Sequence, residues 1–534
     1  MAAVLDVRGL TVALPAGADR AHAVEDVSLS IDAGEILCVV GESGSGKSVT
    51  AFSVMGLADR RALTPVAGQI LLNGEDLLTV SDARLRKLRG EKMAMIFQEP
   101  MTALNPVLRV GDQISEMLEI HTGLSTSERR ARAIDAMRDV NLPEPDEMYR
   151  SYPHQLSGGQ RQRIMIAMAL SLEPQLLIAD EPTTALDVTT QAQILSLIKD
   201  IQRRKGMAVM FITHDFGVVA EIADRVAVMK HGRVVEQGAV TELLGAPQDP
   251  YTQKLIAAVP SMTPPVRPAI GGDSALETKD LVKTYGHAGV FGSGRVVRAA
   301  RDVDLVVRRG ETLGVVGESG SGKSTVARCV MRLIDPSSGE VLIDGDNIAS
   351  LSEGQLRPHR RDIQIVFQDP YRSLNPRRTV GQSIIEGPVN FGLPVSDAQA
   401  RAADLMQVVG LSPDALERFP HQFSGGQRQR ICIARALAME PAILVADEAV
   451  SALDVSVQAQ VLDLLDDVRK RFDLAMLFIT HDLRVAAQIC DRIMVMQKGE
   501  VVEHGATSEV FANPAHAYTR ALLAAAPGAK GELA

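Results

Sequence analysis

Several features are scarce or missing in this chain, and each absence narrows what the protein can be. Its 534 residues include only four cysteines, Cys38, Cys329, Cys432 and Cys490, and no two of them have C-x-x-C spacing. Each lies in an apolar segment, which favours buried structural thiols and fits a reducing, cytosolic location. No stretch of about 18 uncharged apolar residues occurs, so we expect no membrane-spanning helix.

Positive charge is also in short supply. The net charge of −10 and the pI near 5.7 argue against broad, non-specific binding to nucleic acid, although they do not exclude a local basic patch. The N-terminus has no basic segment and passes directly into an alternating, strand-like pattern, so we expect no signal peptide. A composition of 46% hydrophobic and 23% charged residues is ordinary for a soluble globular protein.

The most informative feature that is present is an internal repeat. The octet L-S-G-G-Q-R-Q-R at residues 156–163 returns as F-S-G-G-Q-R-Q-R at residues 423–430. Length alone suggests about three or four domains, and the repeat indicates two copies of about 260 residues each. We place the first lobe at residues 1–262 and the second at residues 274–534. The Pro- and Gly-rich residues 263–273 between them are typical of a short, semi-rigid connector.

Within the first copy, short apolar or alternating runs predict strands, and they are separated by stretches of helical character. The predicted strands are Leu5–Val12, Val24–Ile31, Ile36–Val40, Gln69–Asn73, Gln175–Ala179, Ala208–Ile212, Val226–Lys230 and Arg233–Glu236. The last two are joined by His231-Gly232, which predicts a hairpin. Residues 101–152 are richer in helix formers. Strands that alternate with helices predict an α/β fold with a mostly parallel sheet covered on both faces.

Each copy carries a glycine-rich loop between a predicted strand and a helix. The two loops match the P-loop pattern, G-x-x-x-x-G-K-S, and consist of Gly41, Glu42, Ser43, Gly44, Ser45, Gly46, Lys47 and Ser48, and of Gly317, Glu318, Ser319, Gly320, Ser321, Gly322, Lys323 and Ser324. Backbone N–H groups of such a loop cradle nucleotide phosphates, its lysine reaches the β and γ oxygens, and its serine hydroxyl binds Mg²⁺. The sequence therefore predicts two sites for ATP and Mg²⁺.

Two further patterns predict functional residues: the first would bind an anion, and the second would bind Mg²⁺ and activate water. In the repeated octet, a serine and two glycines open a helix, so that bare N–H groups face outward; these residues are Ser157, Gly158, Gly159 and Gln160, and Ser424, Gly425, Gly426 and Gln427. Downstream, Asp180-Glu181 and Asp447-Glu448 place two carboxylates at the end of a buried strand. We expect the aspartates to support Mg²⁺ and the glutamates to act as general bases toward water.

The octet resembles the signature sequence of ABC-type ATPases. The resemblance implies two tandem ABC ATPase lobes, each with a parallel sheet core, an antiparallel β subdomain and a helical subdomain. It also implies that each signature caps the nucleotide of the opposite lobe within one chain: Ser157 the nucleotide on Lys323, and Ser424 the one on Lys47. The second copy departs from the family pattern after its acids, where Ala449 replaces Pro182. We expect this to tune the turn without loss of activity.

Three shorter motifs are also similar to motifs of this family. Gln98 and Gln368 resemble the Q-loop glutamine, which approaches Mg²⁺ and water and senses the membrane subunits. His214 and His481 resemble the switch histidine that contacts the γ-phosphate. Ala185-Leu186-Asp187 and Ala452-Leu453-Asp454 resemble the D-loop.

The resemblance also implies an aromatic ring stacked on adenine upstream of each P-loop. Tyr285 is the candidate in the second copy, with Phe291 as the next choice. In the first copy the corresponding position is Leu14, so that either stacking is weaker there or His22 substitutes for the ring.

Three features are similar to the peptide and nickel importers within this family. They are the segments after the Q-loops, 102–111 and 373–381; the P-H-Q triplets before the signatures; and the C-terminal elements 249–255 and 517–523. The second element lacks the usual proline before Tyr518. The chain then resembles the two ATPase subunits of a dipeptide or oligopeptide importer fused into one polypeptide. Neither lobe's tail contains a cysteine, so no iron–sulfur cluster is expected.

The resemblance implies partners that the chain itself does not contain. We expect two transmembrane permease subunits, a separate substrate-binding protein, no nucleic acid, and a peripheral position on the cytoplasmic face of the inner membrane. The main prediction is an ATPase for di- or oligopeptide import, with nickel or glutathione import as alternatives. A soluble tandem ABC ATPase acting on ribosomes is the competing class, but it would have a long charged helical linker and a basic surface.

Overall fold

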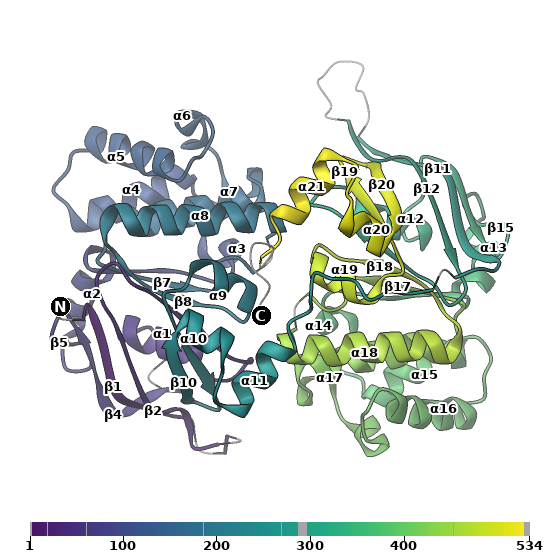
Figure 1. The fold of residues 1–534 in the computed structure, drawn as a ribbon, viewed down its shortest axis with the longest axis horizontal. Coiled ribbons are helices and arrows are strands. Elements are labelled where there is room, and N and C mark those ends of the chain that lie inside the picture. The colour runs from purple at the N-terminus through teal and green to yellow at the C-terminus, as the bar shows by residue number, and fades with distance from the viewer. Residues whose placement is uncertain are drawn as a thin grey trace. The chain divides into compact units, whose positions relative to one another are not determined.

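The computed structural model describes residues 3–15, 17–18, 20–59, 61–184, 186–268, 270–286, 296–451 and 453–527. The chain divides into two compact units, Met1–Val259 and Pro260–Ala529, which we call the first and second lobes. Each lobe contains a four-stranded antiparallel sheet and a six-stranded, mostly parallel sheet (Figure 1). This confirms the predicted α/β class and the arrangement implied by the resemblance.

The first lobe is built from ten strands. The antiparallel sheet has the order β2-β1-β4-β5 and the mixed sheet has the order β10-β9-β3-β8-β7-β6, in which β10 alone is antiparallel to its neighbour. The strands are β1 (Leu5–Ala13), β2 (His22–Ile31), β3 (Ile36–Val40), β4 (Thr64–Leu72), β5 (Glu75–Asp76), β6 (Met93–Ile96), β7 (Leu176–Asp180), β8 (Ala208–Ile212), β9 (Arg225–Lys230) and β10 (Arg233–Ala239).

Helices cover the mixed sheet, and a helical region follows β6, as expected for residues 101–152. The helices are α1 (Lys47–Met55), α2 (Asp82–Glu91), α3 (Pro100–Ala103), α4 (Val110–His121), α5 (Thr126–Asp139), α6 (Pro145–Met148), η1 (Pro153–Gln155), α7 (Gly158–Leu170), α8 (Val188–Lys205), α9 (Phe216–Ile222), α10 (Val240–Gly245) and α11 (Pro250–Ala257). Within this lobe, α4 and α5 lie at the opposite end from β1 and β4 (Figure 1).

The second lobe repeats this plan with sheets of order β12-β11-β14-β15 and β16-β17-β18-β13-β19-β20. Its strands are β11 (Ser274–Tyr285), β12 (Val297–Arg308), β13 (Thr312–Val316), β14 (Ser338–Ile343), β15 (Asp346–Asn347), β16 (Ile363–Val366), β17 (Ile443–Asp447), β18 (Ala475–Ile479), β19 (Arg492–Gln497) and β20 (Glu500–Ala506). Its helices are α12 (Lys323–Val330), α13 (Glu353–Leu356), η2 (Pro358–Arg360), α14 (Pro370–Ser373), α15 (Val380–Asn390), α16 (Val395–Val408), η3 (Pro413–Glu417), η4 (Pro420–Gln422), α17 (Gly425–Leu437), α18 (Val455–Phe472), α19 (Leu483–Ile489), α20 (Thr507–Ala512) and α21 (Ala517–Ala524).

The central strand β3 shows how the core is divided. All five of its residues are buried, and alternate side chains enter different apolar clusters because successive residues of a strand face opposite sides of the sheet. Cys38 and Val40 pack with α4, α5, α7 and α8, whereas Leu37 and Val39 pack with α1 and the antiparallel sheet. Because β3, β6, β7, β8 and β9 are parallel, their carboxyl ends lie at one edge of the sheet. Ligands bind at that edge in sheets of this kind.

Most predicted strands are confirmed, and their limits differ for local reasons. The Ile36–Val40 and Ala208–Ile212 predictions match β3 and β8. β4 begins five residues before the predicted Gln69 and ends before Asn73, because Asn73 turns the chain with φ 49°. The predicted hairpin is confirmed: His231 and Gly232 both have positive φ, as a two-residue turn of this type requires. The four cysteines are buried and free, as expected.

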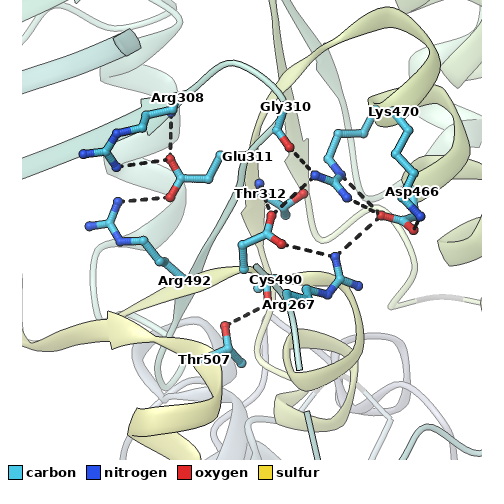
Figure 2. Close-up of polar contacts among 12 residues, drawn as sticks. Arg267, Arg308, Gly310, Glu311, Thr312, Asp466, Lys470, Cys490, Arg492 and Thr507 are labelled. Atoms are coloured by element: carbon cyan, nitrogen blue, oxygen red, sulfur yellow. Dashed lines mark hydrogen bonds and ion pairs between the residues drawn. The ribbon is translucent and has the colours of Figure 1, made fainter. Parts of the chain in front are cut away.

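The connecting segment lies against the second lobe. Arg267 donates to the backbone oxygen of Gln488 at 2.5 Å and forms ion pairs with Asp491 at 3.4 Å and Asp466 at 3.6 Å. Gln488 in turn donates to the backbone oxygen of Ser261 at 2.8 Å. Figure 2 shows the guanidinium of Arg267 beside Asp466, with Lys470 on the other side of that carboxylate. These contacts lie within the second compact unit, which begins at Pro260.

The first lobe has an open cavity at the position that Arg267 occupies in the second. Lys199 and Asp224 stand where the second lobe has Asp466 and Asp491, and together with Gly34 and Gln202 they line a cavity of about 290 Å³. The exchange of one acid for a lysine removes half of the paired negative charge that holds the guanidinium in the second lobe.

Candidate nucleotide site

Each P-loop follows the central strand of its lobe and leads into a helix, as predicted. In the first lobe, Lys47 begins α1 and its Nζ donates to the backbone oxygens of Gly41 at 2.6 Å and Glu42 at 2.9 Å. In the second lobe, Lys323 donates to Gly317 at 2.7 Å and Glu318 at 2.8 Å. Each lysine is thus held by the first two carbonyls of its own loop.

The first glycine of each loop is required by packing. At Gly41 the backbone has φ 149°, and a Cβ atom would lie 2.2 Å from the backbone oxygen of Met229 on β9. Gly317 shows the same approach, with 2.3 Å to the oxygen of Met496. Only a residue without a side chain lets the loop pass this close to the neighbouring strand.

The serine at the end of each loop lies beside the aspartate at the end of a neighbouring strand. Ser48 Oγ donates to Asp180 Oδ1 at 3.1 Å, and Ser324 Oγ donates to Asp447 Oδ1 at 3.3 Å. Burial raises the pKa of Asp180 to about 6, with the Glu181 charge adding to the effect and Ser48 and Lys47 opposing it. The pKa of Asp447 is raised for the same two reasons, burial and the neighbouring Glu448.

These paired oxygens fit the Mg²⁺ that the resemblance implies. A hydroxyl and a carboxylate are the hard oxygen donors that Mg²⁺ prefers, and a cation beside them would offset the burial of the aspartate. Across the residues that the structure describes, no three His, Cys, Asp or Glu side chains gather as a metal cage.

The glutamate after each aspartate is the centre of a polar group drawn from three loops. The carboxylate of Glu181 accepts from Gln98 Nε2 at 2.9 Å and from Thr184 Oγ1 at 3.0 Å, and it lies 3.3 Å from His214 Nδ1. These residues follow β6, β7 and β8, whose carboxyl ends meet at one edge of the sheet. The structure therefore brings the predicted Q-loop, general base and switch histidine together in the first lobe.

The second lobe has the same group. Glu448 accepts from Gln368 Nε2 at 2.9 Å and lies 3.4 Å from His481 Nδ1. Ala449 and Val450 follow it without altering this arrangement, and Ser451, at the position of Thr184, is 3.4 Å from Gln368 Nε2. The glutamine and histidine contacts of the predicted general base are thus kept despite the changed turn, whereas Ser451 Oγ donates to the backbone oxygen of Glu448 at 3.0 Å and Thr184 donates to the carboxylate of Glu181.

The balance of burial and neighbouring charge keeps both glutamates ionised. Burial raises the pKa of Glu181, but the hydrogen bond and charge of His214, together with Lys47 and Thr184, outweigh it, so the pKa lies below its ordinary value. Glu448 follows the same pattern through His481 and Lys323. Burial lowers the pKa of His481, but Glu448 outweighs this and the net pKa is raised. A carboxylate that stays charged can accept a proton from water.

A left-handed backbone at this glutamate was not predicted from the sequence. Glu181 has φ 46° and Glu448 has φ 50°, a region that non-glycine residues occupy rarely and at a cost of about 1–3 kcal/mol. The backbone N–H of each glutamate donates to the last residue of the next strand, Ile212 or Ile479, at 2.9 Å. This bond ties the backbone of the turn that carries the carboxylate to the neighbouring strand.

Both predicted signature helices are confirmed. Ser157 caps α7 by accepting from Gln160 N at 3.2 Å, while the Gln160 side chain accepts from Ser157 N at 2.9 Å. Ser424 and Gln427 repeat this capping box on α17. The two glycines differ in the space available for a side chain. A Cβ at Gly158 would meet no described atom within 4 Å, whereas one at Gly159 would lie 2.7 Å from Thr190 Cγ2 on α8.

The remaining predicted residues are the candidates for adenine stacking and the D-loop. Tyr285 ends β11, is 42% exposed, and has Lys283 Nζ 5.2 Å from its ring centre. Leu14 and His22 lie at the two ends of the β1–β2 connection. Asp187 caps α8, accepting from Thr190 N at 2.9 Å. Phe291 and the D-loop residues Ala185 and Ala452 lie outside the described residues.

Sequence reasoning missed one contact with the P-loops. Tyr251 on α11 and Tyr518 on α21 each place a hydroxyl against the second residue of the loop in the same lobe, with Oη at 3.2 Å from Glu42 N and 3.0 Å from Glu318 N. The sequence singled out both tyrosines as parts of a C-terminal element. Nothing in their spacing indicated that this element returns to the nucleotide site.

None of the helices in the described part of the chain has both the length and the apolarity needed to cross a membrane.

Comparison with known proteins agrees with this geometry. The ABC transporter family model matches residues 24–184 and 300–451, and the model of the oligopeptide/dipeptide transporter C-terminal region matches residues 235–283 and 502–534. The chain is 49% identical to a protein named glutathione import ATP-binding protein GsiA from Salmonella paratyphi A, over 98% of this chain and 89% of that protein. The proteins of that name from Escherichia coli K12 and Shigella boydii are each 48% identical, over 99% of this chain and 90% of theirs. With two ATPase lobes that each end in this C-terminal region, the chain belongs to the ABC transporter ATPases, as the tandem ATP-binding subunit of an importer in the oligopeptide/dipeptide family.

Proposed function

We propose that this protein hydrolyses ATP to drive the import of glutathione. The observation that carries the proposal is the 49% identity to glutathione import ATP-binding proteins, which extends through both lobes and both C-terminal regions. Di- or oligopeptide import was the main prediction from the sequence, with glutathione as an alternative. The similarity to these relatives favours the alternative, and glutathione, a tripeptide, is still a peptide substrate.

Within each lobe, we assign roles to the residues gathered at the edge of the sheet. In the first lobe, Lys47 and the loop N–H groups bind the β- and γ-phosphates, and Glu181 accepts the proton of the attacking water. His214 contacts the γ-phosphate, and Gln98 orients the carboxylate of Glu181 through its 2.9 Å hydrogen bond. The corresponding residues of the second lobe, Lys323, Glu448, His481 and Gln368, carry the same roles.

Ser48 and Asp180 would hold Mg²⁺ in the first lobe, and Ser324 and Asp447 would hold it in the second. When bound, the ion would supply positive charge beside the transferring phosphoryl group. Gln98 and Gln368 lie two residues beyond the strands that flank these acids, a position that supports their assignment to the same site. The capping of each nucleotide by the signature of the opposite lobe stays a prediction from the family resemblance.

The proposed partners are two transmembrane permease subunits and a separate binding protein that selects the ligand. The chain would then act as a peripheral subunit on the cytoplasmic face of the inner membrane. Nucleotide-dependent changes at Glu181 would reach the permease through the Q-loop, because Gln98 donates to the carboxylate and is followed two residues later by α3, where the helical region starts.

Uptake by whole cells tests the proposal. A strain that lacks this chain is complemented with the wild-type chain or with the Glu181→Gln, Glu448→Gln double variant, and the uptake of radiolabelled glutathione, a dipeptide and nickel is measured separately. The proposal expects glutathione uptake to depend on the wild-type chain. Restored uptake of the dipeptide or of nickel, without glutathione, would overturn the substrate assignment. Recovery of ribosomes in place of permeases on affinity capture would overturn the importer partners.

A further inference from the structure

The C-terminal element of the first lobe makes direct contact with the P-loop. The side chain of Tyr251, on the first turn of α11, is buried beneath the loop. Its Oη accepts from the backbone N–H of Glu42 at 3.2 Å and donates to the Glu42 carboxylate at 3.2 Å. Lys230 Nζ lies 4.6 Å from the centre of the ring. One tyrosine thus contacts both the main chain and the side chain of the second P-loop residue.

The position of this tyrosine is set by bonds on the other side of the element. Asp249 caps α11 by accepting from Tyr251 N at 2.8 Å. The carboxylate of Glu236 on β10 accepts from the backbone of Gln248 at 2.8 Å and of Asp249 at 3.2 Å. The start of α11 is therefore bound to the edge strand of the sheet, and the tyrosine is held between that strand and the loop.

The second lobe reaches the same arrangement with different residues. Tyr518 Oη accepts from Glu318 N at 3.0 Å, and Glu503 on β20 accepts from the backbone of Ala515 at 2.7 Å and of His516 at 3.0 Å. Here His516 replaces Asp249 as the cap, with Nδ1 accepting from Tyr518 N at 3.2 Å. The cap and the residue before the tyrosine differ, but the hydroxyl contact with the loop is kept.

This contact bears on the lysine that we assign to ATP. Lys47 Nζ is held by the backbone oxygens of Gly41 and Glu42, and the N–H bonded by Tyr251 belongs to the same short stretch of main chain. In the second lobe, Lys323 is held by Gly317 and Glu318, whose N–H is bonded by Tyr518. Fixing this stretch fixes the two carbonyls that place the ammonium group, and a placed charge binds phosphate without a cost of reorganisation.

We propose that Tyr251 and Tyr518 are positioning residues for ATP, through which the C-terminal element of each lobe sets that lobe's affinity for nucleotide. The proposal rests on the assignment of Lys47 and Lys323 to ATP. It gives the C-terminal region that marks the oligopeptide/dipeptide family a part in the ATPase site itself. Each tyrosine acts on the lobe to which it belongs.

Nucleotide binding by the full chain tests the proposal one site at a time. A fluorescent ATP analogue is titrated into the Lys323→Ala chain, in which the site of the first lobe remains, and then into the same chain carrying Tyr251→Phe. Loss of one hydrogen-bonding hydroxyl with the ring retained predicts about 3- to 10-fold weaker binding. Tyr518→Phe is tested in the mirror background, Lys47→Ala, with the same expectation.

The control is Tyr149→Phe, which removes a hydroxyl bonded to Ser115 at 2.9 Å, away from the P-loop. It should leave the affinity unchanged, and the thermal midpoints of all three phenylalanine variants should agree. Unchanged affinity in Tyr251→Phe and Tyr518→Phe overturns the proposal, as does weakening that only accompanies a lowered thermal midpoint. If the Lys47→Ala, Lys323→Ala double variant binds nucleotide like the wild type, the ATP assignment fails instead, which separates the two failures.

Discussion

Replacement of Glu181 and Glu448 by glutamine removes the negative charge at the centre of each cluster of polar side chains, with little change in the shape of the side chain. A glutamine amide still offers one oxygen, which can accept from Gln98 at the 2.9 Å position. Its other atom becomes an NH₂ group, which cannot take a proton from water. The contacts of Lys47 with Gly41 and Glu42 do not involve this side chain. The substitution thus removes the base and leaves the phosphate-binding loop intact.

The expected magnitude follows from the role of a positioned base. Such a group contributes about 10²- to 10⁴-fold to the rate, which corresponds to about 3–5 kcal/mol of transition-state free energy. We therefore expect the Glu181→Gln, Glu448→Gln double variant to lose 10²- to 10⁴-fold in kcat, as an order-of-magnitude estimate. Its affinity for ATP should stay within about 3-fold of the wild type, less than the loss of one hydrogen bond would cause.

The chain supplies a matched control for this experiment. Glu173 and Glu440 occupy corresponding positions in the two lobes, have φ of 54° and 53°, and form ion pairs with Arg132 and Arg401, respectively. The Glu173→Gln, Glu440→Gln double variant makes the same chemical change at a left-handed, ion-paired glutamate outside the nucleotide site. It should keep wild-type turnover.

The assay measures phosphate release alongside binding of a fluorescent ATP analogue. Turnover of the Glu181→Gln, Glu448→Gln variant within about 3-fold of the wild type, far less than removal of a general base predicts, would refute the assignment of the base. Loss of ATP binding together with turnover would show that the carboxylates hold the nucleotide rather than activate water.

Three further outcomes are expected from the structure. In urea unfolding, Gly159→Ala should lower the free energy of unfolding by about 1–3 kcal/mol, because the new Cβ would crowd Thr190. The free energy of unfolding of Gly158→Ala should stay within about 0.5 kcal/mol of the wild type. Arg267→Ala should lower the free energy of unfolding of the second lobe by about 1.5–3 kcal/mol, because it leaves Asp491 without one charged partner; an unchanged unfolding curve would contradict this. Chelation of Mg²⁺ by EDTA should abolish phosphate release, and added MgCl₂ should restore it; turnover that persists in EDTA would contradict the fit of the metal to the Ser–Asp pairs.

Much of this protein could be predicted from local patterns in the chain. A glycine-rich loop must pass between a strand and a helix to present its N–H groups, so the spacing around Lys47 predicted both β3 and α1. The serine before Gly158 predicted a helix start because serine is a strong N-cap. The repeat of each motif predicted two lobes, since each copy has its own apolar strands to form a core. The burial of the cysteines could be predicted from their apolar neighbours, because apolar segments form the core.

The tertiary structure decided the contacts between segments far apart in the chain. Packing against Thr190, 31 positions along the chain, explains why Gly159 cannot carry a side chain, and a bond to the neighbouring strand accompanies the left-handed turn at Glu181. Tyr251 meets Glu42 across 209 positions of sequence, and this contact arises only when β10 returns along the sheet edge and anchors α11. Hydrophobic periodicity and turn chemistry act over a few residues, so they determine elements and motifs. Which elements lie side by side, and so which hydroxyl reaches the phosphate loop, depends on the packing of the whole lobe.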